Sequence, residues 1–125
     1  MRVPDWAVDG AAAAVAAIHF AISFAEVFLW RRVYPRLKQF DFSPKEGEKV
    51  RPIVQNAGLY NAFMGAALLW TVFVRGGAPS FRYLLLICVA VAGVFGAVTL
   101  KAPKTLALQT APALTALFLM WLSEP

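Results

Sequence analysis

Four long apolar segments divide the chain, and charged residues gather between them rather than within them. The segments span residues 11–30, 54–74, 81–100 and 105–122. At 1.5 Å per residue, a helix of about 20 residues is about 30 Å long, which matches the hydrocarbon core of a bilayer. Backbone groups inside lipid must be satisfied within their own segment. The pattern therefore predicts four transmembrane helices.

The connections between these segments predict how the helices are arranged. Residues 75–80 and 101–104 form short connections that contain proline, and short connections favour antiparallel neighbours. Hydrophobic residues make up 60% of the chain, whereas a typical soluble domain has about 45–50%. We therefore predict an all-α integral membrane fold, a single domain over residues 1–125 with its four helices in an antiparallel bundle.

The remaining connection, residues 31–53, is long and basic, and it contains a helix start. Ser43 is a candidate N-cap, Pro44 would occupy the first helical position, and Glu46 follows three residues after the cap. This arrangement is typical of a capping box. We expect a short helix at the membrane surface over about residues 44–51.

Basic residues are distributed unevenly between the two predicted sides of the membrane. Nine Lys and Arg residues lie in connections 31–53 and 101–104, and three lie on the opposite side. Because basic loops stay in the cytoplasm, both termini are expected outside, in a multi-pass protein of a bacterial inner membrane. This orientation explains the net charge of +5 better than a nucleic-acid partner, and we expect none.

The strongest polar residues inside the apolar segments all fall in the predicted cytoplasmic half. His19, Ser23, Glu26 and Trp30 are spaced by 4, 3 and 4 residues, so they form one stripe on the first helix. The polar positions of the other segments are Asn56, Tyr60, Asn61 and Gln109. Asn61 lies about 140° around the helix from Asn56 and is expected to bond a neighbouring helix.

Glu26 and His19 are the candidates for chemistry. A charged acid at the centre of a membrane helix costs about 2.5–3.5 kcal/mol, and such residues usually face a bundle interior or a wet cavity. We take His19 and Glu26 as candidate catalytic residues for proton transfer. Trp30, Asn56, Tyr60, Asn61 and Gln109 are candidate ligand-binding residues. The alternative is that Glu26 pairs with a polar neighbour and only fixes helix packing.

Small residues and prolines are expected to shape the last two helices. Gly93 and Gly96 would let the third helix approach its neighbours closely. Pro112 should free the carbonyl of Leu108. Trp30 and the other three tryptophans lie near segment ends, where interfacial anchors are common. Cys88, the only cysteine, excludes an internal disulfide and is expected to be a small buried side chain.

Four motifs in order resemble one known family. They are His19-x6-Glu26-x3-Trp30, Asn56-Ala57-Gly58-Leu59-Tyr60-Asn61, Ala92-Gly93-Val94-Phe95-Gly96-Ala97-Val98-Thr99 and Gln109-x2-Pro112-Ala113. Together they resemble small bacterial four-helix integral membrane proteins catalogued as a domain of unknown function, number 1304. The chain departs from that pattern at Ala57, where the family typically has Gln, and at Phe95, where it has Tyr. The resemblance implies the fold and the site residues, and it implies no activity.

Three functions fit these residues. The first is a site that binds or transforms a small apolar or amphipathic, lipid-like molecule. The second is a transporter or proton-coupled permease subunit. The third is a structural or accessory membrane subunit, in which the polar residues fix helix packing and the basic loop docks a partner or an anionic lipid. No nucleotide-binding, metal or cofactor motif is present, so we expect no cofactor. The sequence is also compatible with assembly of several copies into a homo-oligomer.

Overall fold

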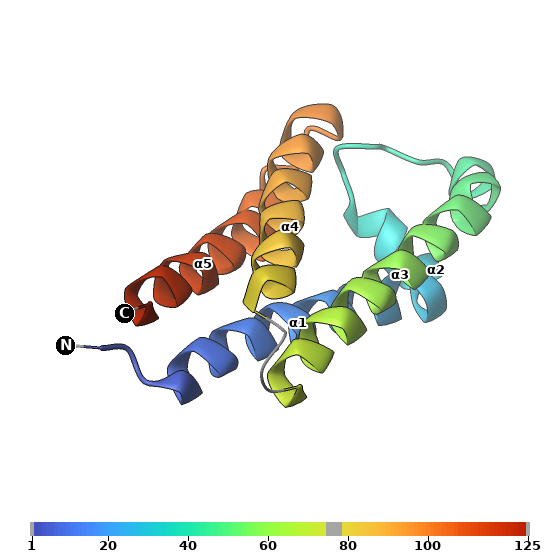
Figure 1. Ribbon diagram of the computed structural model, residues 1–125. Helices are drawn as coiled ribbons and strands as arrows, with labels where there is room; N and C mark the ends of the chain where they lie inside the picture. The colour runs from blue at the N-terminus through green and yellow to red at the C-terminus, as the bar shows by residue number, and fades with distance from the viewer. Residues whose placement is uncertain (1, 75–78, 125) are drawn as a thin grey trace.

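The computed structural model describes residues 2–74 and 79–124, and within these residues the regular structure is entirely helical (Figure 1). The elements in chain order are α1 (Asp5–Phe28), α2 (Trp30–Val33), the 3-10 turn η1 (Tyr34–Arg36), α3 (Pro44–Phe73), α4 (Pro79–Thr99), the π-helical turn η2 (Leu106–Thr110) and α5 (Ala111–Ser123). The prediction of an all-α fold is therefore confirmed. Most of the predicted connection 75–80 lies outside the described residues.

Three of the helical segments are long and apolar enough to cross a membrane. They are Asp5–Phe28, Pro79–Thr99 and Leu106–Ser123. Helix α3 contains the remaining apolar segment, but its charged first turns and amide side chains make it more polar than the other three. Length and composition thus indicate a membrane protein, with three candidate spans among the described residues.

Helices α1 and α3 form one closely packed pair. Two glycines of α3 lie where this helix meets α1: a Cβ at Gly58 would lie 2.9 Å from Val27 Cγ2, and one at Gly65 would lie 3.1 Å from the Ala16 carbonyl oxygen. The two glycines are seven residues apart, so they share one helix face. The close approach of the two helices therefore depends on the absence of side chains at these positions.

Helices α4 and α5 form a second pair, joined through η2. A Cβ at Gly93 would overlap Thr110 Oγ1, which confirms that Gly93 permits close approach. The Thr110 hydroxyl donates to the Ala90 carbonyl at 2.9 Å, and the Thr105 hydroxyl lies 2.7 Å from the Gly93 carbonyl. Hydroxyl-to-backbone bonds of this kind are common between membrane helices.

The two pairs share a core near the chain termini and diverge toward the other end (Figure 1). Val15, Leu68, Leu86, Val89 and Ala116 from all four long helices are at most 1% exposed. The predicted cytoplasmic end lies on the diverging side. Large apolar side chains of α1 are exposed there, among them Phe24 and Phe28.

The boundaries of the first two predicted helices are corrected by the structure. Helix α1 ends at Phe28 rather than Trp30, because Leu29 leaves the helical conformation with φ −114° and ψ 13°. The expected surface helix and second span are one continuous helix, α3, which contains Pro52. Both halves of the predicted capping box are present at Ser43 and Glu46, so the helix begins where the sequence indicates.

Proline also alters the start of the last helix. The turn η2 ends two residues before Pro112, and the Ala111 N–H bonds the Leu106 carbonyl five residues back. Because Pro112 has no N–H, the carbonyl of Leu108 loses its usual partner in the helix. The π-helical turn η2 contains this carbonyl. A further correction concerns Cys88, which is exposed on α4 rather than buried.

Candidate functional site

Glu26 and Asn61 join α1 to α3 in the predicted cytoplasmic half. The Asn61 side chain donates from Nδ2 to Glu26 Oε2 at 2.9 Å, and both residues are partly buried. Gly58, one turn before Asn61, lies so close to α1 that a Cβ there would be 3.0 Å from Glu26 Cβ. The prediction that Asn61 bonds a neighbouring helix is confirmed. Sequence reasoning missed Gly58, although its seven-residue spacing from Gly65 is a usable signal.

His19 lies in the packed part of α1. Its side chain is 3% exposed, and its Nδ1 atom is 2.9 Å from the Val15 carbonyl oxygen. A carbonyl only accepts a hydrogen bond, so Nδ1 carries the proton. The ring therefore bonds its own helix one turn back, and the structure shows no bond between His19 and Glu26.

Trp30 is not an interfacial anchor. Its side chain is 4% exposed, and its Nε1 donates to the Gly47 carbonyl at 2.8 Å. The reason is the break at Leu29, after which the chain turns back over the end of α1. The ring also packs on Tyr34, with 5.7 Å between the ring centroids. Trp30 therefore holds the first turns of α3 against the end of α1.

The other three candidate residues lie apart from Glu26. Asn56 and Tyr60 are exposed on α3, and the Tyr60 ring packs edge-on against Phe63, with 5.9 Å between the ring centroids. Gln109 is partly buried in η2, and its Cβ would be 3.0 Å from a Cβ added at Gly93. Of the predicted ligand-binding residues, the structure brings only Asn61 to Glu26.

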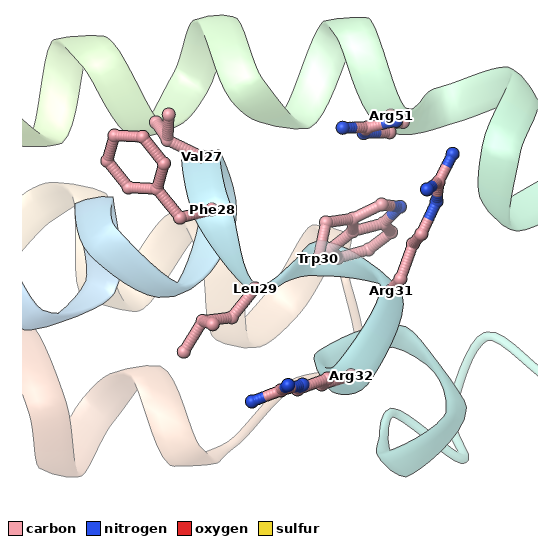
Figure 2. Close-up of a pocket in the computed structure, with 7 residues that line it drawn as sticks. All are labelled: Val27, Phe28, Leu29, Trp30, Arg31, Arg32 and Arg51. Carbon is pink, nitrogen blue, oxygen red and sulfur yellow. The ribbon is translucent and has the colours of Figure 1, made fainter.

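A cavity of about 220 Å³ lies where α1 ends. Its lining residues are Val27, Phe28, Leu29, Trp30, Arg31, Arg32 and Arg51, and Figure 2 shows that Arg51 comes from α3 while the rest follow one another at the end of α1. Sequence reasoning treated these arginines only as topology signals. The cavity was not predictable, because the Leu29 break and the return of α3 create it.

One carboxylate holds two of these arginines. Arg31 bonds Glu48 with both ends of its guanidinium, Nε to Oε1 at 2.7 Å and a terminal nitrogen to Oε2 at 3.1 Å. Arg51 lies 3.7 Å from Glu48 Oε2. The bond from Arg31 holds the pKa of Glu48 below its ordinary value, and the same bond raises the pKa of Arg31.

Gln55 supplies a hydrogen-bond donor to the C-terminal end of α1, beside this cavity. Its Nε2 donates to the Val27 carbonyl at 2.9 Å. The last carbonyls of a helix have no partner within the helix, so an amide from α3 supplies one. Sequence reasoning did not single out Gln55, because nothing in its spacing shows which carbonyl it faces.

A second polar cluster lies at the opposite end of the molecule. The Arg82 guanidinium is 2.9 Å from Asp9 Oδ1 and donates to the Thr71 carbonyl at 2.7 Å and to the Thr71 hydroxyl at 3.0 Å. Arg82 is 8% exposed. This cluster ties α1, α3 and α4 together, and counting Arg82 as a charge of the outer side missed it.

Comparison with protein families gives one match. The model of the family described as "Protein of unknown function (DUF1304)" matches residues 13–121, which include all four motifs of the resemblance, from His19 to Ala113. No curated protein and no solved structure matches the chain. In the part of the chain that the structure describes, no group of three or more His, Cys, Asp or Glu side chains is placed to hold a metal ion.

Proposed function

This chain belongs to the DUF1304 family, and we propose that it is an integral membrane protein that binds a small amphipathic, lipid-like molecule beside Glu26. In this proposal α3 is the second of four spans, and the basic connections face the cytoplasm of an inner membrane. The observation that carries the proposal is the partly buried Glu26–Asn61 pair between two closely packed helices.

Only one of the two carboxyl oxygens of Glu26 has a hydrogen-bond partner among the described residues. Among the described residues, Asn61 bonds Oε2, and no bond is made to Oε1. No buried side-chain oxygen or nitrogen of the described residues lacks a partner, so Oε1 lies at the surface of the chain, within reach of a ligand. A surface oxygen that faces lipid without a partner is costly, and intramembrane acids usually serve a site. A ligand with one hydroxyl or amine group on an apolar body would supply the missing donor.

The surroundings of Glu26 suit the apolar body of such a ligand. Ile22, one turn before Glu26 on the same face of α1, is partly buried, and Ala57, one turn before Asn61 on α3, is exposed. Neither side chain carries a polar group, so the apolar body of the ligand would contact them beside the carboxyl group.

The proposal is one of binding. His19 is buried and bonded to its own helix, which supports a packing role, so proton transfer would fall to Glu26. The Glu26–Asn61 bond itself favours one rival, a purely structural role in an accessory subunit. The two functions differ in what they require of Glu26, because only ligand binding needs its charge or its proton.

The Glu26→Gln variant separates them. Gln keeps an acceptor oxygen for Asn61, so helix packing and melting temperature should change little, while a donor group of the ligand loses its carboxylate partner. We expect the apolar small molecule that copurifies with the wild-type protein, measured by mass spectrometry of its extract, to fall at least fivefold. Asn56→Gln, an exposed amide of α3, is the matched control. Equal recovery from Glu26→Gln and wild type leaves only the structural role.

A further inference from the structure

The arginine-lined cavity at the end of α1 has features that the Glu26 proposal does not use. Its lining combines three cationic side chains with the last apolar turn of a membrane helix. We propose that this cavity binds the phosphate group of an anionic membrane lipid. This site is separate from Glu26, and the inference does not rest on the proposed ligand there.

The charge of the cavity suits a phosphate. Arg31, Arg32 and Arg51 line it, and Glu48 is the carboxylate bonded to two of them, so these four groups carry a formal net charge of +2. The Arg36 guanidinium also donates to the Arg32 carbonyl, which places a further cation beside the turn. Guanidinium groups bond phosphate oxygens in pairs, which makes arginine the preferred residue for such groups.

The cationic side chains come from two elements that the ligand would bridge. Figure 2 shows Arg31 reaching from α2 toward α3, where Arg51 lies above Trp30, while Arg32 extends from the other side of α2. Arg31 and Arg51 already meet through Glu48. The Arg32 side chain makes no hydrogen bond or ion pair with the described residues, and it is exposed. It is therefore the guanidinium most available to a phosphate.

The apolar part of the lining identifies the source of the phosphate as a lipid. Val27, Phe28 and Leu29 close one side of the cavity, and they end the apolar segment of α1. Phe28 and then Phe24 continue from there along the exposed face of that helix. A headgroup among the arginines would lie at the membrane boundary, where basic side chains meet anionic lipids, with its acyl chains against these rings.

The test compares two double variants that lose equal charge. Arg32→Gln/Arg51→Gln removes two cations of the cavity, and Lys101→Gln/Lys104→Gln removes two from the other basic connection. The purified full-length protein is titrated with phosphatidylglycerol, and bound lipid is counted by native mass spectrometry. We expect at least fivefold weaker binding for the arginine variant and less than twofold for the lysine variant. Equal losses would overturn the site, since they would show a general charge effect.

Further arms identify the ligand and guard against misfolding. Diacylglycerol, which lacks the phosphate, should not be retained, and retention equal to that of phosphatidylglycerol contradicts the inference. Inorganic phosphate at millimolar concentration should displace little lipid, because it lacks the apolar contacts, and full displacement would show a site for free phosphate instead. Arg32→Gln alone, at an exposed position, should keep the melting temperature and still weaken binding about threefold. Glu26→Gln should bind phosphatidylglycerol as the wild type does, whatever the fate of its own ligand.

Discussion

Gly58 shows how one missing side chain positions the polar pair. Asn61 is short, so its amide reaches Glu26 only because α3 lies very close to α1 one turn earlier. A Cβ at Gly58 would lie 2.9 Å from Val27 Cγ2 and 3.0 Å from Glu26 Cβ, inside normal contact distances. The bond of 2.9 Å between Asn61 and Glu26 is thus a consequence of packing at a neighbouring residue.

The Gly58→Ala variant tests this dependence. Moving two helices apart to admit a methyl group typically costs about 1–3 kcal/mol, and we expect a loss of that size in the free energy of unfolding in detergent. Gly10→Ala is the control, because nothing lies within 4 Å of its added Cβ, and alanine is the better helix former there. A Gly58→Ala protein as stable as Gly10→Ala would contradict the close-packing account.

Single residues also show where sequence reasoning stops. The angular position of Asn61 was enough to predict its bond to another helix, because a regular helix fixes directions. Trp30 was misassigned because the predicted helix was extended through Leu29, and one non-helical residue redirects everything after it. Arg82 was counted with the outer-side charges, yet it is buried against Thr71 and Asp9. Hydrophobic periodicity predicts which residues share a helix face, but it does not predict which residues on other helices they contact.

At the scale of elements, the start of α3 is the best-defined helix end in the chain. Its capping box was predictable, since Ser43, Pro44 and Glu46 occupy the required positions within four residues. Its continuity through Pro52 was not, because a proline ordinarily marks a helix boundary. The long-range contacts of these first turns, from Trp30 to Gly47 and from Arg31 to Glu48, depend on the fold and not on local sequence.

These contacts predict a pH dependence at the start of α3. Hydrogen bonds from Arg31 to Glu48, and from Ser43 to Glu46, lower the pKa of each carboxyl group in the folded state. Their stabilisation is therefore fully present above the ordinary pKa, 4.5, and is lost as pH falls through the lowered folded values.

Hydrogen exchange measures this effect. Protection of the first amides of α3 should stay constant from pH 7 to pH 5, once intrinsic exchange rates are corrected, and should fall below pH 4.5. Glu48→Gln should weaken protection at pH 7 and show a smaller acid-induced loss. A loss of protection already at pH 6 would be inconsistent with these two hydrogen-bonded carboxyl groups and would require another titrating group.

At the scale of the whole molecule, the helical class of the fold was more predictable than the exact ends of its helices. The length of the apolar segments predicted an all-helical fold, and the structure confirms it for the described residues, with three candidate spans. The divergence of the two helix pairs could not be predicted, because the sequence does not specify crossing angles. Polar clusters at both ends, Glu26–Asn61 and Asp9–Arg82–Thr71, join helices from different parts of the chain.

The proposed orientation is testable with single cysteines. On a Cys88→Ala background, Arg2→Cys should react with a membrane-impermeant maleimide in intact cells. Gln39→Cys, at an exposed position of the long connection, should react only after the membrane is opened, because nine basic residues keep that side in the cytoplasm. The background protein should stay unlabelled. The reverse pattern of labelling would overturn the orientation.

The central claim, that Glu26 holds a lipid-like molecule, is tested most directly by an experimental structure of the protein in a lipid nanodisc. The account predicts elongated density along the face of α1 that carries Ile22 and Glu26, with its polar end about 2.7–3.2 Å from Glu26 Oε1, and Asn61 still bonded to Oε2. Density of this kind that disappears in Glu26→Gln would establish the site. A Glu26 carboxyl group bonded only to protein, with no ligand density at Oε1, would contradict the claim. The Glu26–Asn61 pair would then serve only to pack α1 against α3.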